Sequence, residues 1–181
     1  MAISEAAFRK LALEEPDEQW ELDCGTLRRK PGMTALHNRT MTRLVVFLAQ
    51  QLDQAEFDVR CNSGHVRRSA ERYYIPDVTV IPVALVLPQL DQRTLEVYED
   101  PLPLVVEVWS PSTGDYDVES KLIEYQRRGD LEIWRLHPYE RTVVAWRRQP
   151  DGSYTETMFT GGTVSPVALP NVTIDLDALF A

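Results

Sequence analysis

The sequence PLVVEVWSPSTGDYDVESK, residues 103–121, contains a buried-strand pattern followed by a short turn and a charged helix. Residues 104–109 are apolar and rich in valine apart from Glu107, which is typical of a central strand covered on both faces. An ionised carboxylate in such a strand is unfavourable unless it is paired or binds a metal ion. We therefore expect Glu107 to be neutral, to form a structural ion pair, or to belong to a functional site.

A helix is predicted over residues 115–128, because apolar side chains recur there at positions i, i+4 and i+7 and the pattern ends at Gly129. Lys121 lies at the border of the apolar face. Its ammonium group can point toward the end of the preceding strand. Two alternatives stay open, namely a surface lysine with only its stem buried, or an ion pair with Asp117 four residues earlier.

Composition limits the class of protein. The chain has 181 residues, of which 44% are hydrophobic and 26% charged, so we expect one domain over 1–181. The net charge of −9 argues against non-specific coating of nucleic acid through phosphate neutralisation. No apolar run of membrane-spanning length and no hydrophobic leader occur, which predicts a cytoplasmic protein without a membrane partner. Cys24 and Cys61 form no metal-binding or disulfide pattern.

The remaining sequence alternates between helical and strand periodicity. The expected elements are a helix after Ser4, a hairpin at 19–30, a helix at 37–53, strands at 57–61, 65–69 and 77–82, an irregular segment at 83–100, strands at 131–137, 141–148 and 153–159, and a terminal segment at 175–180. This order predicts an α/β (α+β) fold with a central mixed β-sheet flanked by helices. The length of the crossover from the Glu107 strand to 131–137 predicts that these two strands are parallel.

Three charged residues have a spacing that suggests chemistry on phosphates. Asp77 begins one strand, Glu107 lies in another, and Lys121 follows on the next helix. Two carboxylates suit Mg²⁺, and a neighbouring lysine can orient the attacking water and offset negative charge in the transition state. The set fits phosphodiester hydrolysis, although the Pro76–Asp77 pair alone is a weak signal.

The segments WELDCG (20–25), YYIPDVTVIP (73–82), EVWSPST (107–113) with its spaced Asp117 and Lys121, and RTVVAW (141–146) resemble the Uma-type endonuclease family of the PD-(D/E)xK superfamily. The resemblance extends over almost the whole chain and implies a restriction-endonuclease-like fold. It also implies Mg²⁺, with Mn²⁺ as a possible substitute, and DNA as substrate. A homodimer is a hypothesis from chemistry alone, because cutting both strands of a duplex with a one-site domain commonly requires two copies.

Site residues follow from the same resemblance, position by position. Asp77, Glu107 and Glu21 correspond to the metal ligands. The motif lysine would stand two residues after Glu107, where this chain has Trp109, so Lys121 on the next helix is its counterpart. Asp117 resembles a supporting residue that orients Lys121.

Two positions depart from the family pattern. Trp109 replaces an aliphatic residue, and His137 replaces an aspartate before Pro138.

Other polar residues receive simpler interpretations. His37 is expected to face solvent near a helix start, and His65 to lie on an exposed strand face. Arg67, Arg68 and Arg72 form the best candidate DNA-facing patch, or else an ordinary solvated face.

The leading hypothesis is a metal-dependent endonuclease, in which Asp77, Glu107, Lys121, Glu21 and Asp117 form the catalytic site. The alternative is a catalytically silent module with the same fold that binds nucleic acid or protein. A third possibility is a hydrolase of small phosphodiesters. The serines lie in turns without a nucleophile elbow, and no glycine-rich phosphate loop occurs, so these patterns support neither a serine hydrolase nor a nucleotide-binding loop.

Overall fold

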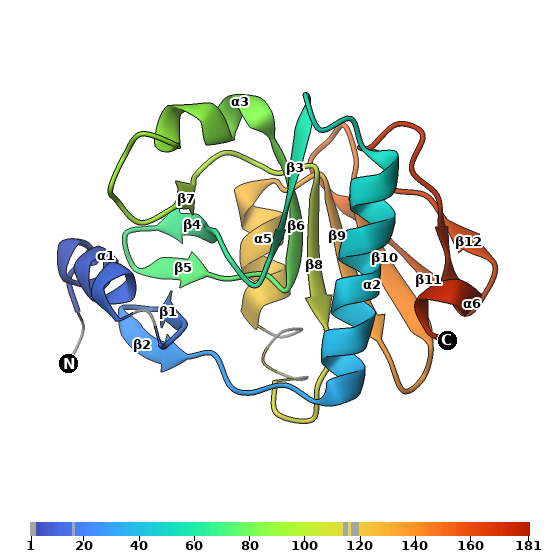
Figure 1. Cartoon of the computed structure of the whole chain (residues 1–181), viewed down its shortest axis with the longest axis horizontal. Coiled ribbons are helices and arrows are strands. Elements are labelled where there is room, and N and C mark those ends of the chain that lie inside the picture. The colour runs from blue at the N-terminus through green and yellow to red at the C-terminus, as the bar shows by residue number, and fades with distance from the viewer. Residues whose placement is uncertain (1–2, 16, 114–115, 117–119) are drawn as a thin grey trace.

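A computed structural model of the protein describes residues 3–15, 17–113, 116 and 120–181 (Figure 1). Its elements are α1 (Glu5–Glu14), β1 (Trp20–Asp23), β2 (Thr26–Arg29), α2 (Ala35–Gln51), β3 (Phe57–Cys61), β4 (His65–Ser69), β5 (Arg72–Tyr74), β6 (Val78–Pro82), α3 (Val83–Val86), the 3-10 helix η1 (Leu87–Gln89), β7 (Val97–Tyr98), β8 (Leu104–Val108), α5 (Leu122–Arg128), β9 (Glu132–His137), β10 (Thr142–Arg148), β11 (Tyr154–Phe159), β12 (Thr163–Val164), β13 (Ile174–Asp175) and α6 (Leu176–Leu179).

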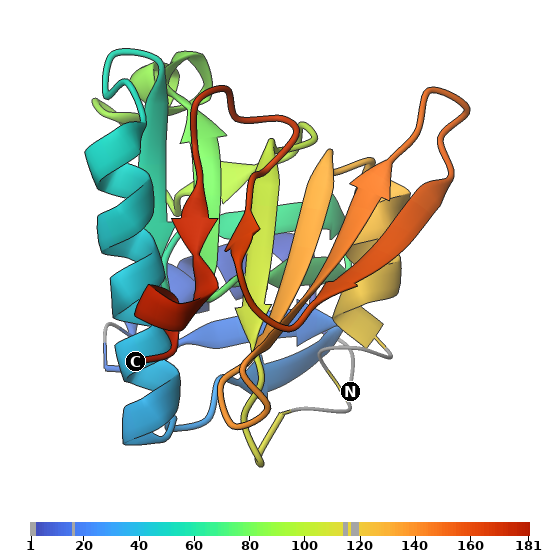
Figure 2. The same cartoon turned by 90° about the vertical axis from the view of Figure 1, so that its right-hand side faces the viewer.

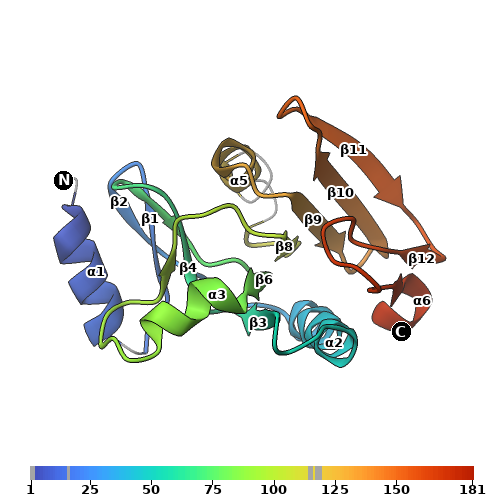
Figure 3. The same ribbon diagram turned by 90° about the horizontal axis from the view of Figure 1, so that it is seen from above.

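The larger sheet has six strands in the order β11-β10-β9-β8-β6-β3. Strands β8 and β9 are parallel, as predicted, and every other pairing in this sheet is antiparallel. Helix α2 covers one face of this sheet and α5 the other (Figure 3). The expected mixed sheet flanked by helices is therefore confirmed.

Strand β8 is buried on both faces because its side chains alternate between the two layers. Val106 packs in one core with Leu44 and Leu48 of α2. Val105 packs in a second core with Tyr125 of α5. Glu107, two residues after Val105, consequently points toward the α5 side.

A second sheet of five strands, in the order β2-β1-β5-β4-β7, holds the N-terminal hairpin. The predicted hairpin exists, but it pairs with β5 through Leu22 and Tyr73 instead of joining the central sheet. Helix α1 covers this sheet with Phe8. Because Phe8 lies against His65, the expected exposure of His65 is wrong, and that side chain is buried.

Helix ends follow ordinary capping rules. Ser4 and Thr34 accept hydrogen bonds from the first turns of α1 and α2. Helix α5 ends at Gly129, which adopts a left-handed φ of 83°.

Of the helix predicted over 115–128, residues 115 and 117–119 lie outside the described residues. The predicted irregular segment 83–100 contains only the short elements α3, η1 and β7.

Figure 2 shows the six-stranded sheet fanning from β3 beside α2 to β11 at the opposite edge. In the part of the chain that the structure describes, no helix has both the length and the apolar character to cross a membrane.

Candidate active site

The first site residues are brought together by strand pairing. Val78 of β6 pairs with Val106 of β8, so Asp77 and Glu107 occupy the next positions along these antiparallel strands. The backbone N–H of Val108 donates a hydrogen bond to Asp77 Oδ2 at 2.8 Å. The two acidic residues from distant parts of the sequence therefore lie at the same end of the central sheet.

Lys121 joins two carboxylates from different layers. Its Nζ lies 2.8 Å from Glu21 Oε1 and 3.3 Å from Glu107 Oε1, and all three side chains are at most 6% exposed. Glu107 also accepts a hydrogen bond from the Tyr125 hydroxyl at 2.5 Å, and Glu21 accepts one from the Ile75 N–H at 2.8 Å. The surface-lysine alternative is wrong, because the ammonium group reaches the strand as predicted.

Asp77 has its own set of partners. Lys30 Nζ lies 2.8 Å from Oδ1, and His37 Nε2 lies 3.0 Å from Oδ2. Burial raises the pKa of Asp77, but the Lys30 ammonium and His37 imidazole outweigh it and hold this pKa well below its ordinary value. Lys30 also donates to Asn62 Oδ1 and to the Ile75 carbonyl. Asp77 is thus an ionised carboxylate with most of its hydrogen-bonding capacity used.

His37 is buried at the site, contrary to the exposure predicted from its sequence. Its side chain is fully buried and binds Asp77, whereas solvent exposure was expected. Thr34 caps α2, so His37 lies in the first turn, and it precedes Met41 and Leu44 on the face that packs against the sheet. The four-residue spacing from His37 to Met41 was the available signal.

Lys30 and Tyr125 were also missed. Lys30 ends a run of three basic residues, and no local sequence feature distinguishes it from Arg28 and Arg29 as a site residue. Tyr125 could have been found, since it lies one helical turn after Lys121.

A cavity of about 270 Å³ opens beside these residues. Of the predicted set, Glu21, Glu107 and Lys121 line it, whereas Asp77 does not. Its other lining residues are Arg28, Arg29, Lys30, Pro31, Met33, Ser112, Thr113 and Tyr116. The lining carries four cationic side chains against two carboxylates, in a chain whose net charge is −9.

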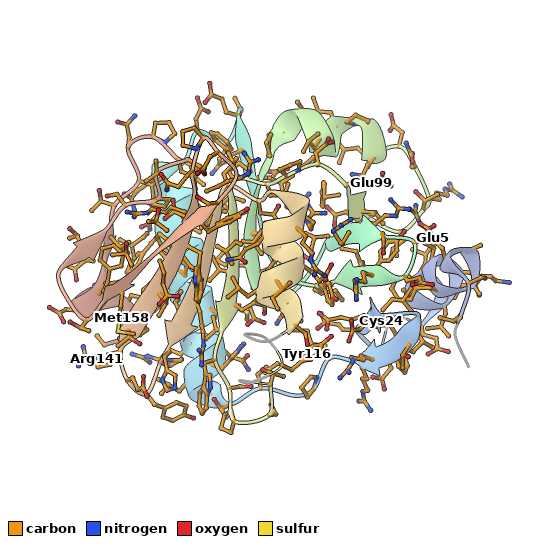
Figure 4. The ribbon with its side chains drawn as sticks, turned by 180° about the vertical axis from the view of Figure 1, so that it is seen from behind. Glu5, Cys24, Glu99, Tyr116, Arg141 and Met158 are labelled. Atoms are coloured by element: carbon orange, nitrogen blue, oxygen red, sulfur yellow. The ribbon has the colours of Figure 1, made fainter. Side chains whose placement is uncertain are left out.

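Tyr116 forms part of this wall. Figure 4 shows it near the lower end of α5, on the side of the β1–β2 hairpin. The Arg28 guanidinium lies 4.4 Å from the centre of its ring. Burial, followed by the charges of Glu21 and Asp23, raises the pKa of Tyr116, so its hydroxyl remains a hydrogen-bond donor. That buried hydroxyl has no hydrogen-bond partner among the described residues.

The carboxylates suit a metal ion only in part. Within 3–15, 17–113, 116 and 120–181, no three His, Cys, Asp or Glu side chains are grouped as ligands of one ion. Glu21 and Glu107 nevertheless share one cavity and one ammonium partner. Two hard oxygen donors fit Mg²⁺, which keeps several waters and commonly takes one or two protein carboxylates. Asp117, the fifth predicted site residue, lies outside the described residues.

The candidate arginine patch faces acidic partners. Arg67 lies 2.9 Å from Glu5, and Arg68 and Arg72 lie 3.7 and 3.4 Å from Glu124. Local carboxylates therefore offset much of its positive charge.

A solved structure shares the whole architecture. The crystal structure from Anabaena variabilis described as "a putative nuclease belonging to DUF820" is 18% identical, with a TM-score of 0.79. The match covers 98% of this chain and 97% of the other. At this identity the likeness shows the fold alone, a mixed β-sheet flanked by helices.

The family model named Uma2 and described as "Putative restriction endonuclease" matches residues 6–177. This chain belongs to the Uma2 family, which confirms the resemblance identified in the sequence. No curated protein matches the chain in sequence.

Proposed function

We propose that this protein is a metal-dependent endonuclease that hydrolyses DNA phosphodiester bonds in the cavity beside β8. The observation that carries the proposal is the contact of one buried ammonium, Lys121, with the carboxylates of Glu21 and Glu107 on the wall of that cavity. A structural ion pair has no need of an open cavity. Family membership and the nuclease-like fold support the same class of reaction.

Mg²⁺ is the proposed ion, with Mn²⁺ as a substitute. Glu107 and Glu21 are its proposed ligands on the cavity wall, and Asp77, which is not grouped with them among the described residues, is the third ligand that the family resemblance implies. Glu107 and Glu21 would hold it from the cavity wall. Asp77 would contribute from the adjacent strand position, where Lys30 now contacts its Oδ1. When bound, the ion would polarise the phosphodiester and lower the pKa of a bound water.

Lys121 is proposed to act on the attacking water. The Lys121 side chain is 3% exposed and its ammonium is held by two carboxylates, so the position of the ammonium is defined before substrate binds. From there it would orient the water and offset negative charge that develops on the phosphate. Asp117 remains the proposed supporting residue for Lys121.

DNA is the proposed substrate because the cavity lining carries four cationic side chains, which suit the phosphates of a polyanion, against two carboxylates. Arg28 and Arg29 are half exposed or more at its rim, although they also contact Asp23 and Glu18. A homodimer is proposed as the form that cuts both strands of a duplex.

One observation favours the alternative of a module that binds without cutting. Asp77 is already engaged by Lys30, His37 and the Val108 N–H, an arrangement that is complete without an ion. Under this alternative the three partners would simply stabilise the end of the central sheet.

Cleavage of supercoiled plasmid and of single-stranded DNA, each with Mg²⁺, Mn²⁺ or EDTA, tests the proposal. We expect metal-dependent cutting that Glu107→Gln and Lys121→Met both abolish. Lys10→Met is the matched control for Lys121→Met, since Lys10 is 73% exposed on α1, outside the cavity lining. A folded wild-type protein that binds DNA but cuts nothing with either metal would contradict the nuclease and support the module.

A further inference from the structure

Three aromatic rings lie together at the ends of β8 and β9. Trp109 and His137 are stacked, with ring centres 4.3 Å apart and planes 24° from parallel. Tyr139 stands edge-on to Trp109, with ring centres 5.8 Å apart. Trp109 and His137 are partly exposed and Tyr139 is 53% exposed. We call Trp109, His137 and Tyr139 the aromatic cluster.

The aromatic cluster adjoins the proposed active site. Trp109 directly follows Val108, whose N–H binds Asp77. The Tyr139 hydroxyl lies 3.4 Å from Thr34 Oγ1, and the neighbouring Met33 lines the cavity. In Figure 1 the end of β8, the start of α2 and the turn between β9 and β10 lie at the same lower edge of the molecule.

The imidazole ring of this cluster is held in place. His137 Nδ1 accepts a hydrogen bond from the Glu140 N–H at 3.1 Å, so the proton of the neutral ring lies on Nε2. This bond and the stacking on Trp109 orient the ring. Trp109 and His137 are the two positions at which the sequence departs from the family pattern, and the structure places these departures in direct contact.

The chemistry of the surroundings indicates one kind of ligand. A half-exposed tyrosine beside a fixed Trp–His stack offers flat apolar surface for another ring. The adjacent cavity supplies cationic side chains suited to phosphates. Flat rings beside a cationic groove are the elements by which proteins bind single-stranded nucleic acid, since every base has a face that stacks.

We propose that the aromatic cluster binds an unstacked nucleobase next to the phosphodiester group in the cavity, so that single-stranded or locally opened nucleic acid is preferred over intact duplex. The proposal rests on the proposed function, because it takes the ligand to be the nuclease's own substrate. The cluster would hold the strand by its base while the cavity holds its backbone.

Fluorescence anisotropy with two labelled single-stranded oligonucleotides in EDTA tests this without cleavage. One is oligothymidylate, and the other is an abasic strand of equal length and charge. We expect Tyr139→Ala to weaken oligothymidylate binding about tenfold and to leave abasic-strand binding unchanged, because stacking depends on the base. Tyr139→Phe, which keeps the ring, should retain wild-type affinity. Leu90→Ala, at a residue 66% exposed outside the cavity lining, is the matched control.

Equal weakening of both oligonucleotides by Tyr139→Ala would overturn the proposal, because the loss would not depend on the base. So would unchanged affinity in Tyr139→Ala, or no measurable wild-type binding to oligothymidylate. The nuclease hypothesis is judged separately by metal-dependent cutting. If the protein never cuts but Tyr139→Ala loses base-dependent binding, the base-binding role of the aromatic cluster stands and the nuclease hypothesis is wrong. If the protein cuts but Tyr139→Ala binds both oligonucleotides as wild type does, only the base-binding role is wrong.

Discussion

Replacing Lys121 by methionine removes the only positive charge that contacts both Glu21 and Glu107 in the described contacts, while keeping a side chain of similar length. The two contact distances allow the carboxylate oxygens to be about 6 Å apart at most, and like charges at that separation repel by roughly 3 kcal/mol at an effective dielectric constant of about 20. Measured losses on removing one partner of a buried pair are similar, about 3–5 kcal/mol. We therefore expect the free energy of unfolding to fall by about 3 kcal/mol in Lys121→Met.

The stability of Lys121→Met should also respond to Mg²⁺. Without the Lys121 ammonium, the carboxylates of Glu21 and Glu107 on the cavity wall should bind Mg²⁺ more tightly than they do in wild type. A ligand at about 100 times its Kd stabilises a protein by about 2.7 kcal/mol. In urea unfolding, Mg²⁺ should restore most of the free energy of unfolding that Lys121→Met loses. The same ion should change the free energy of unfolding of wild type and of Lys10→Met less. Adding Glu21→Gln to Lys121→Met should restore stability without the ion. Unchanged stability in Lys121→Met, or an equal effect of Mg²⁺ on wild type, Lys121→Met and Lys10→Met, would show that Lys121 does not hold Glu21 and Glu107 together.

Three further predictions concern other parts of the molecule. Arg128→Ala should lower the free energy of unfolding by about 3–5 kcal/mol in urea, because Arg128 and Asp130 form a pair with side chains 1% and 0% exposed; a loss below about 1 kcal/mol would contradict this. The hydrogen bond from the Tyr73 hydroxyl, with help from Arg67 and against the effect of burial, lowers the pKa of Glu5 from 4.5 to about 2. The ionised Glu5 carboxylate therefore contributes its full stabilisation of the fold above pH 4.5, and this contribution is lost as the pH falls toward 2. Glu5→Gln should flatten the pH dependence of unfolding in that window, and an unchanged slope would count against it. Lys30→Met should increase Mn²⁺ affinity, measured by calorimetry, because it exposes Asp77 Oδ1 to another cation; equal or weaker affinity would show that Lys30 does not compete with the ion.

The central sheet could be predicted because its signals are local. Residues 104–108 are continuously apolar apart from Glu107, and the length of the following crossover implies a parallel neighbour. The contact of Lys121 with the strand could be predicted for the same reason, since helical periodicity puts that residue beside the apolar face.

The second sheet and half of the Asp77 environment could not be predicted. Strand β5 has only three residues, too few for a period to show, so nothing indicated that the hairpin would pair with it. Lys30 reaches Asp77 across 47 positions of sequence, through a hairpin whose direction depends on that unseen pairing. Such contacts are set by tertiary packing and leave no pattern near either residue.

Calorimetric titration of Mn²⁺ into the protein without DNA tests most directly whether the carboxylates form a metal site. We expect a saturable site in wild type that disappears in Glu107→Gln and persists in Glu14→Gln, because the Glu14 side chain is 62% exposed on α1. Identical Mn²⁺ binding in wild type and Glu107→Gln, or no binding in either folded protein, would contradict it and leave Glu107 as one half of a structural ion pair.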